Sequence, residues 1–301
     1  MKRIAVQNLS IRPARWKMST ILLLLVWLLS NPSAVAQIWL GSSEIGFTVG
    51  GMNYIGDLNN QSMLGKPNLG YGGFYRYNFD ERWSLRFDVD YGHIEGGNPD
   101  YIALRNLSFR SYIWEATARA EFNFFPYSMR DDHYRWTPYL FGGVGFFVFN
   151  PTAWYTDPYT EESGWVELRP LGTEGQGTPL APGKSRYILK QLSMPFGLGV
   201  KMRPSKSFTF SVEYGFRKTW TDYLDDVSTT YVDNSQLAYY SGDVAAALAD
   251  RSGEVSEGYV NAAGIKRGDD SLDDWYAYFH ISLSVKLDLL FAHFLKKKCK
   301  K

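Results

Sequence analysis

Few residues in this sequence combine the types and the spacing that chemistry requires. His280 and Ser282 are two positions apart, so a β-strand would place both on one face, as a base beside a nucleophile. A three-residue match often arises by chance, and the polar face of this segment is expected to point away from lipid. The sequence contains no HExxH, G-x-S-x-G or Walker motif and no cysteine-rich metal site. We therefore expect neither catalytic activity nor a cofactor.

The segment 221–273 is acidic, and carboxylates are ligands that Ca²⁺ prefers. Its acidic residues do not follow the spacing of a calcium-binding loop, so we expect a solvated charged surface. Within this segment, Arg267, Gly268 and Asp269 form the tripeptide of integrin ligands, but a match this short predicts only a turn. No metal site is expected.

The dominant pattern is an alternation between bulky apolar residues and small or charged ones. Between Trp83 and Gly92, one set of alternate positions holds Trp, Leu, Phe, Val and Tyr, and the other holds Ser, Arg, Asp, Asp and Gly. A β-strand sends these two sets to opposite faces. A tilted strand crosses an outer membrane with ~9–11 residues, and each segment with this pattern is long enough. The expected strands are 44–54, 69–79, 83–94, 109–124, 136–149, 188–202, 208–220 and 274–287. We predict an all-β fold, an eight-stranded antiparallel transmembrane barrel of the OmpA or OmpX type.

The connections between these strands alternate in length. Those at 80–82, 126–135 and 203–207 are short, whereas those at 55–68, 95–108, 150–187 and 221–273 are long. Outer-membrane barrels have short periplasmic turns and long outward loops. The pattern therefore predicts a multi-pass protein of the bacterial outer membrane with both chain ends in the periplasm.

The two strand faces differ in what they can fill. An eight-stranded barrel has an interior only just wide enough for side chains, and the aromatic residues of the apolar face are too bulky for it. The polar face presents glycines and charges of both signs, which can pair across a narrow interior. This disfavours a soluble lipocalin-like barrel and predicts a plugged lumen rather than a pore. The charges expected in the lumen are Arg86, Asp88, Glu115, Arg119, Glu121, Glu213 and Arg217.

The chain ends carry two further signals. Basic residues precede an apolar run and a small-x-small site at 34–36, which predicts a signal peptide over 1–36, a barrel over 37–288 and a basic periplasmic tail over 289–301. Removing five bases and no acids from 32 bases and 31 acids leaves 27 against 31, a net charge of −4 that disfavours nucleic-acid binding. The only cysteine, Cys299, lies in the tail, so no intramolecular disulfide is expected.

The connections contain longer strings that resemble a known family. These are NYIGDLN at 53–59, RNLSFR at 105–110, WVELRPLGTEGQG at 165–177, YLDDVSTTYV at 223–232, and RGD at 267–269 followed by DWY at 274–276. They look like the PorG family of the type IX secretion system. The resemblance spans roughly residues 44–287.

The resemblance implies a component of an outer-membrane secretion assembly, neither an enzyme nor the translocation channel. Barrels of this family are associated with the periplasmic ring of PorK and PorN and are needed to secrete proteins that carry the C-terminal sorting domain. It supplies no catalytic or contact residues, so the candidate sites are our own. Long-loop residues expected to cap the mouth or to bind a second partner, such as a translocon or attachment component, are Trp165, Glu167, Leu168, Glu174, Tyr223, Leu224, Asp225 and Asp226. Residues expected at a periplasmic contact are Asp131, Asp132, Arg135, Lys206, Phe294, Lys296, Lys297 and Lys298.

Two alternatives remain open. One is a structural or adhesive barrel of the OmpA or OmpX type, although no peptidoglycan-binding domain follows residue 287. The other is a lipid A-modifying barrel enzyme that uses the H-x-S residues. Outer-membrane lipid is a partner in every case.

Overall fold

The computed structural model describes residues 41–59, 67–97, 105–128 and 135–287. The expected signal peptide over 1–36 and the tail over 289–301, with Cys299, lie outside these residues. Among the described residues, no helix is both long and apolar enough to cross a membrane.

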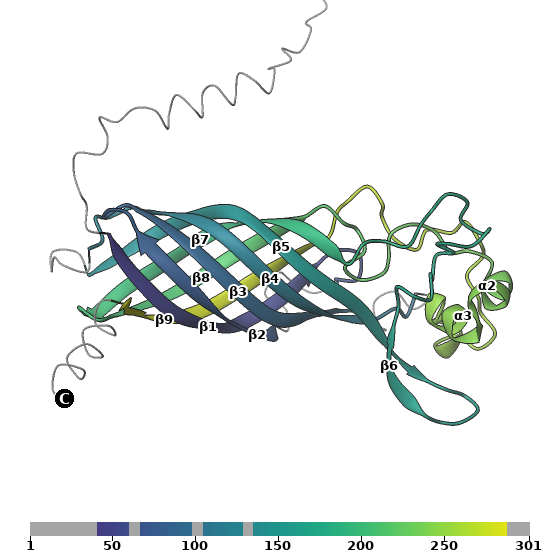
Figure 1. Cartoon of the computed structure of the whole chain (residues 1–301). Coiled ribbons are helices and arrows are strands. Elements are labelled where there is room, and N and C mark those ends of the chain that lie inside the picture. The colour runs from purple at the N-terminus through teal and green to yellow at the C-terminus, as the bar shows by residue number, and fades with distance from the viewer. Residues whose placement is uncertain (1–40, 60–66, 98–104, 129–134, 288–301) are drawn as a thin grey trace, which may run out of the picture. The chain divides into compact units, whose positions relative to one another are not determined.

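Eight antiparallel strands form the barrel wall. They are β1 (Ser42–Ile55), β2 (Asn68–Asn78), β3 (Trp83–Gly96), β4 (Phe109–Asn123), β5 (Trp136–Thr156), β7 (Lys190–Ser205), β8 (Phe208–Thr219) and β9 (Trp275–Lys286). Each pairs with its neighbour in the order β4-β3-β2-β1-β9-β8-β7-β5, and the pairing of β4 with β5 closes the ring. Figure 1 shows the strands inclined around a common axis. The predicted eight-stranded antiparallel barrel is confirmed, and closure leaves no unpaired edge along the wall.

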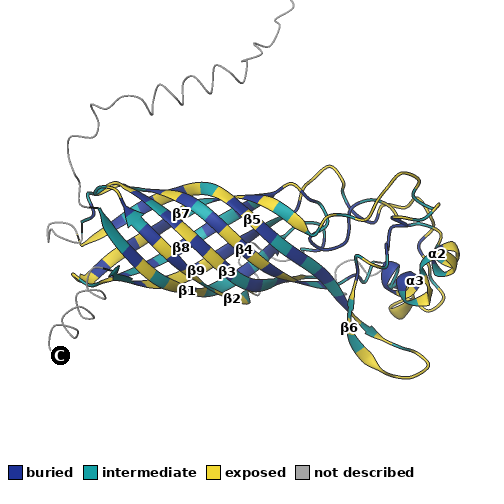
Figure 2. Cartoon of the chain, in the orientation of Figure 1, coloured by how far each residue is buried: buried dark blue, intermediate teal, exposed yellow. Residues whose placement is uncertain are grey.

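Burial alternates along every strand of the wall, as Figure 2 shows. On β3, Ser84, Arg86 and Asp88 are buried, whereas Trp83, Phe87 and Val89 are each about half exposed. The apolar side chains therefore point outward and the charged ones inward, the reverse of a soluble protein. A closed barrel with this outward apolar face has the construction of a membrane-spanning barrel.

Glycines give the inward side chains room. A Cβ atom on Gly145 would lie 2.2 Å from Ser193 Oγ and 3.1 Å from Glu115 Oε1. A side chain at this position would clash with the Ser193 hydroxyl, which donates to Glu115, and would crowd the Glu115 carboxylate. The glycines within strands thus make space for charged neighbours.

The long connections contain more regular structure than the alternation predicted. β5 does not end at 149 but continues to Thr156 and forms a hairpin with β6 (Ser163–Glu167), inside a segment that we predicted to be a loop. The last connection contains helices α2 (Asn234–Ser241) and α3 (Asp243–Ala249) and a short 3-10 helix, η2 (Ser252–Glu254). We call the side with these connections the long-loop end and the opposite side the short-turn end.

Candidate functional site: a filled lumen and a loop cap

Among the described residues, the lumen contains equal numbers of buried acidic and basic side chains. All are at most 3% exposed. The acids are Glu44, Asp88, Asp90, Glu115, Glu121 and Glu213, and the bases are Arg76, Arg86, Arg119, Lys201, Arg203 and Arg217. This balance is what a narrow, poorly solvated interior requires, because each unpaired buried charge would cost several kcal/mol.

Near the short-turn end, the charges form a chain across the barrel. Arg76 Nη1 lies 3.3 Å from Glu44 Oε2, and Arg76 Nε lies 3.0 Å from Glu121 Oε2. Lys201 Nζ donates to the same Glu121 Oε2 at 2.9 Å. The chain therefore links β1, β2, β4 and β7.

At mid-barrel, two arginines occupy directly opposed positions. Arg86 of β3 is in register with Arg119 of β4, an arrangement that destabilises a sheet unless the charges are compensated. Asp88 compensates them, because its two carboxylate oxygens lie 2.7 Å from Arg86 Nε and 3.0 Å from Arg119 Nε. Glu213 lies 2.8 Å from Arg86 Nη1 and 3.3 Å from Arg119 Nη2. The two carboxylates bind both guanidinium groups and fill the centre of the lumen.

The H-x-S residues belong to this filled interior. His280 Nε2 lies 2.5 Å from Glu213 Oε1, and Ser282 Oγ lies 2.5 Å from Ser211 Oγ. Both side chains are at most 3% exposed and point away from the lipid-facing surface. An acyl chain on the outside of the barrel has no access to either residue in this arrangement.

A tyrosine from a turn is buried at the short-turn end. Tyr127 follows β4 and is 3% exposed, with its hydroxyl 2.9 Å from Thr209 Oγ1. Lys201 Nζ lies 5.3 Å from the centre of its ring, a cation–π contact. From the sequence we expected this residue in a short turn, with no role of its own.

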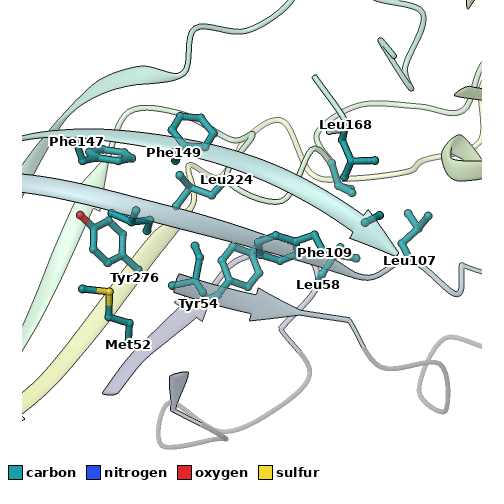
Figure 3. Close-up of a cluster of buried hydrophobic side chains, with 14 of the residues drawn as sticks. Met52, Tyr54, Leu58, Leu107, Phe109, Phe147, Phe149, Leu168, Leu224 and Tyr276 are labelled. Carbon is teal, nitrogen blue, oxygen red and sulfur yellow. The ribbon is translucent and has the colours of Figure 1, made fainter. Parts of the chain in front are cut away.

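At the long-loop end, an apolar cluster joins the strand ends to the loops. Tyr54 and Phe149 from the wall pack in the same cluster as Leu168 and Leu224 from the long connections (Figure 3). Both leucines are at most 3% exposed, and full burial of a leucine contributes about 1.5–3 kcal/mol. We call the packed segments 168–176, 221–231 and 265–268 the cap.

The polar centre of the cap is Glu174, which is 2% exposed. Its carboxylate accepts hydrogen bonds from Ser228 N at 2.8 Å and from Thr229 N at 3.0 Å. Arg267 Nη1 donates to it at 3.1 Å, and Arg267 Nη2 lies 3.7 Å from Asp226 Oδ2. The Glu174 carboxylate thus joins the loop after β6 to two parts of the loop between β8 and β9, one near its start and one near its end.

A second contact ties the cap to the wall. The Tyr54 hydroxyl lies 2.6 Å from Asp225 Oδ2 and 2.8 Å from Asp274 Oδ1, and Asp274 Oδ2 accepts from Leu224 N at 2.9 Å. One hydroxyl has one proton, so a second proton on one of the two carboxyl groups is needed to satisfy both contacts. Burial raises the pKa of Asp225 to about 7 and raises that of Asp274 well above its usual range, consistent with a shared proton.

The structure separates the predicted long-loop residues into two groups. Leu168, Glu174, Leu224, Asp225 and Asp226 are buried in the cap. Trp165 is 46% exposed on the β5–β6 hairpin and so is not buried in the cap, and its other expected role, binding a second partner, stays a prediction. Glu167 is exposed on the same hairpin, and Tyr223 is half-buried beside Tyr187.

The predicted short-turn residues are only partly described. Arg135 and Lys206 are exposed at the short-turn end. The remaining ones, Asp131, Asp132, Phe294, Lys296, Lys297 and Lys298, lie outside the described residues.

Several residues that matter here were missed by the sequence analysis. Glu44 and Lys201 follow the same alternation as the predicted lumen charges, so the pattern contains the signal for them. Arg267 is the clearest omission, because we expected an ordinary turn and the structure buries its side chain in the cap. No local signal marks it, since its partners are 93 and 41 residues away along the chain. Across the described ranges, no group of three or more His, Cys, Asp or Glu side chains is placed to hold a metal ion.

Comparisons with known proteins found one family profile and several solved structures. A family profile described as a domain of unknown function, DUF6089, matches residues 18–163. A search of curated proteins found no similar sequence. Among solved structures, the chain is similar to Ail, the attachment invasion locus protein of Yersinia pestis, at 12% identity and a TM-score of 0.35, covering 82% of this chain and 97% of that one. It is also similar to Neisserial surface protein A at 10% identity and a TM-score of 0.34, covering 82% and 97%. The outer membrane protein OprG of Pseudomonas aeruginosa matches at 12% identity and a TM-score of 0.34, covering 81% and 95%.

The fold itself rests on this chain's own strand pairings. An even number of strands closes the ring, the apolar side chains face outward, and short turns and long loops lie at opposite ends. The chain is a closed eight-stranded barrel of the outer-membrane kind, filled along its lumen and capped at its long-loop end.

Proposed function

We propose that this protein is an outer-membrane component of the type IX secretion system that assembles with, or anchors, the periplasmic ring of PorK and PorN. The observation that carries the proposal is the location of the family-like strings. The strings at 165–177 and 223–232 include Glu174, Leu224, Asp225 and Asp226, which hold the cap on the barrel. Resemblance at residues that determine this cap is a stronger argument than resemblance along a strand, because apolar alternation is common to all such barrels.

The filled lumen supports an assembly role over a transport role. The paired charges from Glu44 to Arg217 occupy the interior, and Tyr127 and the cap lie at its two ends. A barrel filled in this way acts through its outer surfaces rather than through a channel. We take the protein to be non-enzymatic for a related reason, since His280 and Ser282 are both buried in the lumen.

The orientation follows the general rule for outer-membrane barrels, with the short-turn end in the periplasm. Arg135 and Lys206 are then exposed on the side of the ring, and they form the described part of the proposed contact. The tail over 289–301 would emerge on the same side, because β9 ends at Lys286 there. A surface-side partner, such as a translocon or attachment component, would meet the long-loop end.

One observation favours a second function. The β5–β6 hairpin presents Trp154 and Tyr159, which are 45% and 91% exposed. A structural or adhesive barrel of the OmpA or OmpX type would use such a hairpin as its contact surface.

A deletion strain tests the proposal. Loss of this protein should stop secretion of cargo with the C-terminal sorting domain while lipid A remains unchanged, and the intact gene should restore secretion. Normal secretion in the deletion strain would refute the type IX role, and loss of adhesion alone would favour the second function. If lipid A deacylation disappears and the double variant His280→Ala with Ser282→Ala fails to restore it, the enzymatic alternative is correct.

A further inference from the structure

The strand β6 is open on one side. It lies at the end of the sheet order, and within the described residues it pairs with β5 alone. β4 pairs with β5 only as far as Thr152, so residues 153–156 and β6 form a two-stranded ribbon beyond the barrel wall. Figure 1 shows this ribbon leaving the wall and projecting to one side.

The hydrogen bonds at the two ends of the ribbon identify the backbone groups on the open side. Asp157 N donates to Glu162 O at 2.9 Å, and Leu168 N donates to Pro151 O at 3.0 Å. In an antiparallel pair, positions bonded to the partner strand alternate with positions whose groups point away from it. Glu162 and Leu168 are bonded to the β5 side, so the alternate positions between them, 164 and 166, are bonded to β5 as well. The residues of β6 whose N–H and C=O groups face the open side are Ser163, Trp165 and Glu167.

This edge has only some of the features that usually protect an edge strand. Natural edges are short, covered or bulged, or carry charged residues or Pro. β6 is five residues long and carries Glu167, but its sequence, Ser-Gly-Trp-Val-Glu, has no Lys or Pro. On its outer face, Trp165 packs edge-to-face against Trp154 with ring centroids 5.4 Å apart. Both rings are nearly half exposed. Arg110 Cζ lies over the Trp165 ring, 4.1 Å from its centre, so a side chain of an added strand would pack on the remaining exposed surface of the pair.

The charge of the ribbon indicates what kind of strand fits. Residues 157–167 include Asp157, Glu161, Glu162 and Glu167 and contain no Lys or Arg. Pairing two copies of this chain edge to edge would bring 4 + 4 = 8 like charges together, which disfavours self-association. A strand with basic residues is complementary to this surface.

We propose that the open edge of β6 is a strand-addition site for an extended, basic segment of a partner protein. Main-chain groups of Ser163, Trp165 and Glu167 would bond the added strand, while one of its apolar side chains packs on the Trp154–Trp165 pair. The proposal is independent of the type IX assignment, because it rests only on the pairing, exposure and charge of the ribbon.

Peptide binding to the full chain in detergent micelles tests this proposal. The probe is a fluorescent peptide, Lys-Val-Thr-Val-Thr-Lys, and the key variant is Glu167→Pro, which removes an outward N–H without touching the bonds to β5. Glu167→Ala is the matched control, because it removes the charge and keeps the N–H. We expect Glu167→Pro to bind the peptide about 10-fold more weakly than Glu167→Ala, as loss of a main-chain hydrogen bond and a steric clash predict. The pair Ser163→Pro and Ser163→Ala should behave in the same way, and heat-modifiable migration in SDS gels shows that each barrel is folded.

Four results would overturn the proposal. The wild-type chain could fail to bind the peptide, or the proline and alanine variants could bind it equally, which would indicate charge attraction alone. Equal binding of a peptide with a central proline would have the same meaning. Dimerisation of the chain that Glu167→Pro abolishes would make this edge an interface between copies instead.

Discussion

Replacing Arg267 with methionine should loosen the cap without unfolding the barrel. Arg267 is 2% exposed, and its guanidinium donates to Glu174 Oε1 at 3.1 Å, to the backbone oxygen of Asp226 at 2.5 Å and to that of Ala249 at 3.2 Å. Methionine keeps most of the volume of the side chain and removes all three hydrogen bonds. The carboxylates of Glu174 and Asp226 then remain buried without their cation.

The expected loss of cap stability follows from the burial of the ion pair between Arg267 and Glu174. Removing one partner of a buried ion pair costs about 3–5 kcal/mol, because the remaining charge is not compensated. Glu174 keeps its bonds from Ser228 N and Thr229 N, which favours the lower part of this range. At 1.4 kcal/mol for each factor of ten, the local opening equilibrium of the cap should shift by roughly two to four orders of magnitude.

Amide hydrogen exchange of residues 222–229 measures this shift directly. We expect the protection of these amides to fall by roughly two to four orders of magnitude in Arg267→Met, whereas the amides of β3 and β8 keep their protection. Lys266→Met is the control, because Lys266 is the adjacent residue and its side chain is 65% exposed. Adding Glu174→Gln to Arg267→Met should recover part of the protection by removing one buried charge. Equal protection in Arg267→Met and Lys266→Met would refute the assignment of Arg267 as the cation that holds the cap together.

Three further predictions concern the wall, the cap and the tail. Leu283→Arg places a charge on the outward face of β9 and should cost ~2–4 kcal/mol near mid-membrane. It should therefore impair barrel assembly, whereas Leu283→Phe should not, and heat-modifiable migration in SDS gels measures this. Normal assembly of Leu283→Arg would mean that the inward and outward faces are inverted. Burial raises the pKa of Asp225 to about 7 and that of Asp226 to about 6, against ~4 in an unfolded chain. The folded cap thus binds these protons more tightly, and the resulting stabilisation is present below pH ~4 and is lost as the pH rises through 6 to 7. Amide protection of residues 222–229, corrected for intrinsic exchange, should therefore fall between pH 5 and pH 8. Protection that rises over this range would contradict the assignment. Deleting 292–301 should leave the barrel folded but weaken co-purification of the ring proteins at low salt. This difference from the full chain should shrink as salt is raised, because salt screens the charges of the basic tail. Unchanged co-purification at low salt would remove the tail from the proposed contact.

The wall could be predicted from the sequence because a strand has a period of two and one of its faces meets lipid. Ser84, Arg86 and Asp88 are buried for the same reason that Trp83 and Phe87 are exposed, and no distant residue is needed to assign them. The hairpin of β5 and β6 was missed because Trp154 and Trp165 lie beyond the apolar band, where one buried face no longer enforces strict alternation.

The cap could be predicted only in outline. Leu168 and Leu224 are apolar residues in polar surroundings, which indicates burial, but nothing near either residue identifies the other as its neighbour. The contacts of Tyr54 with Asp225 and Asp274 span 171 and 220 residues, and such pairings depend on how the whole barrel closes. The sequence left two roles open for Trp165 for a similar reason, because its exposure depends on the direction in which the hairpin leaves the wall.

Site-specific photocrosslinking in cells tests the proposed role most directly. A crosslinking amino acid is introduced at Arg135 or Lys206, which are exposed at the short-turn end, and at Tyr159, which is 91% exposed at the long-loop end. An assembly barrel with its short turns in the periplasm should give crosslinks to PorK or PorN from the first two positions and none from Tyr159. Recovery of neither ring protein from Arg135 or Lys206, or their recovery from Tyr159 instead, would contradict the proposed role.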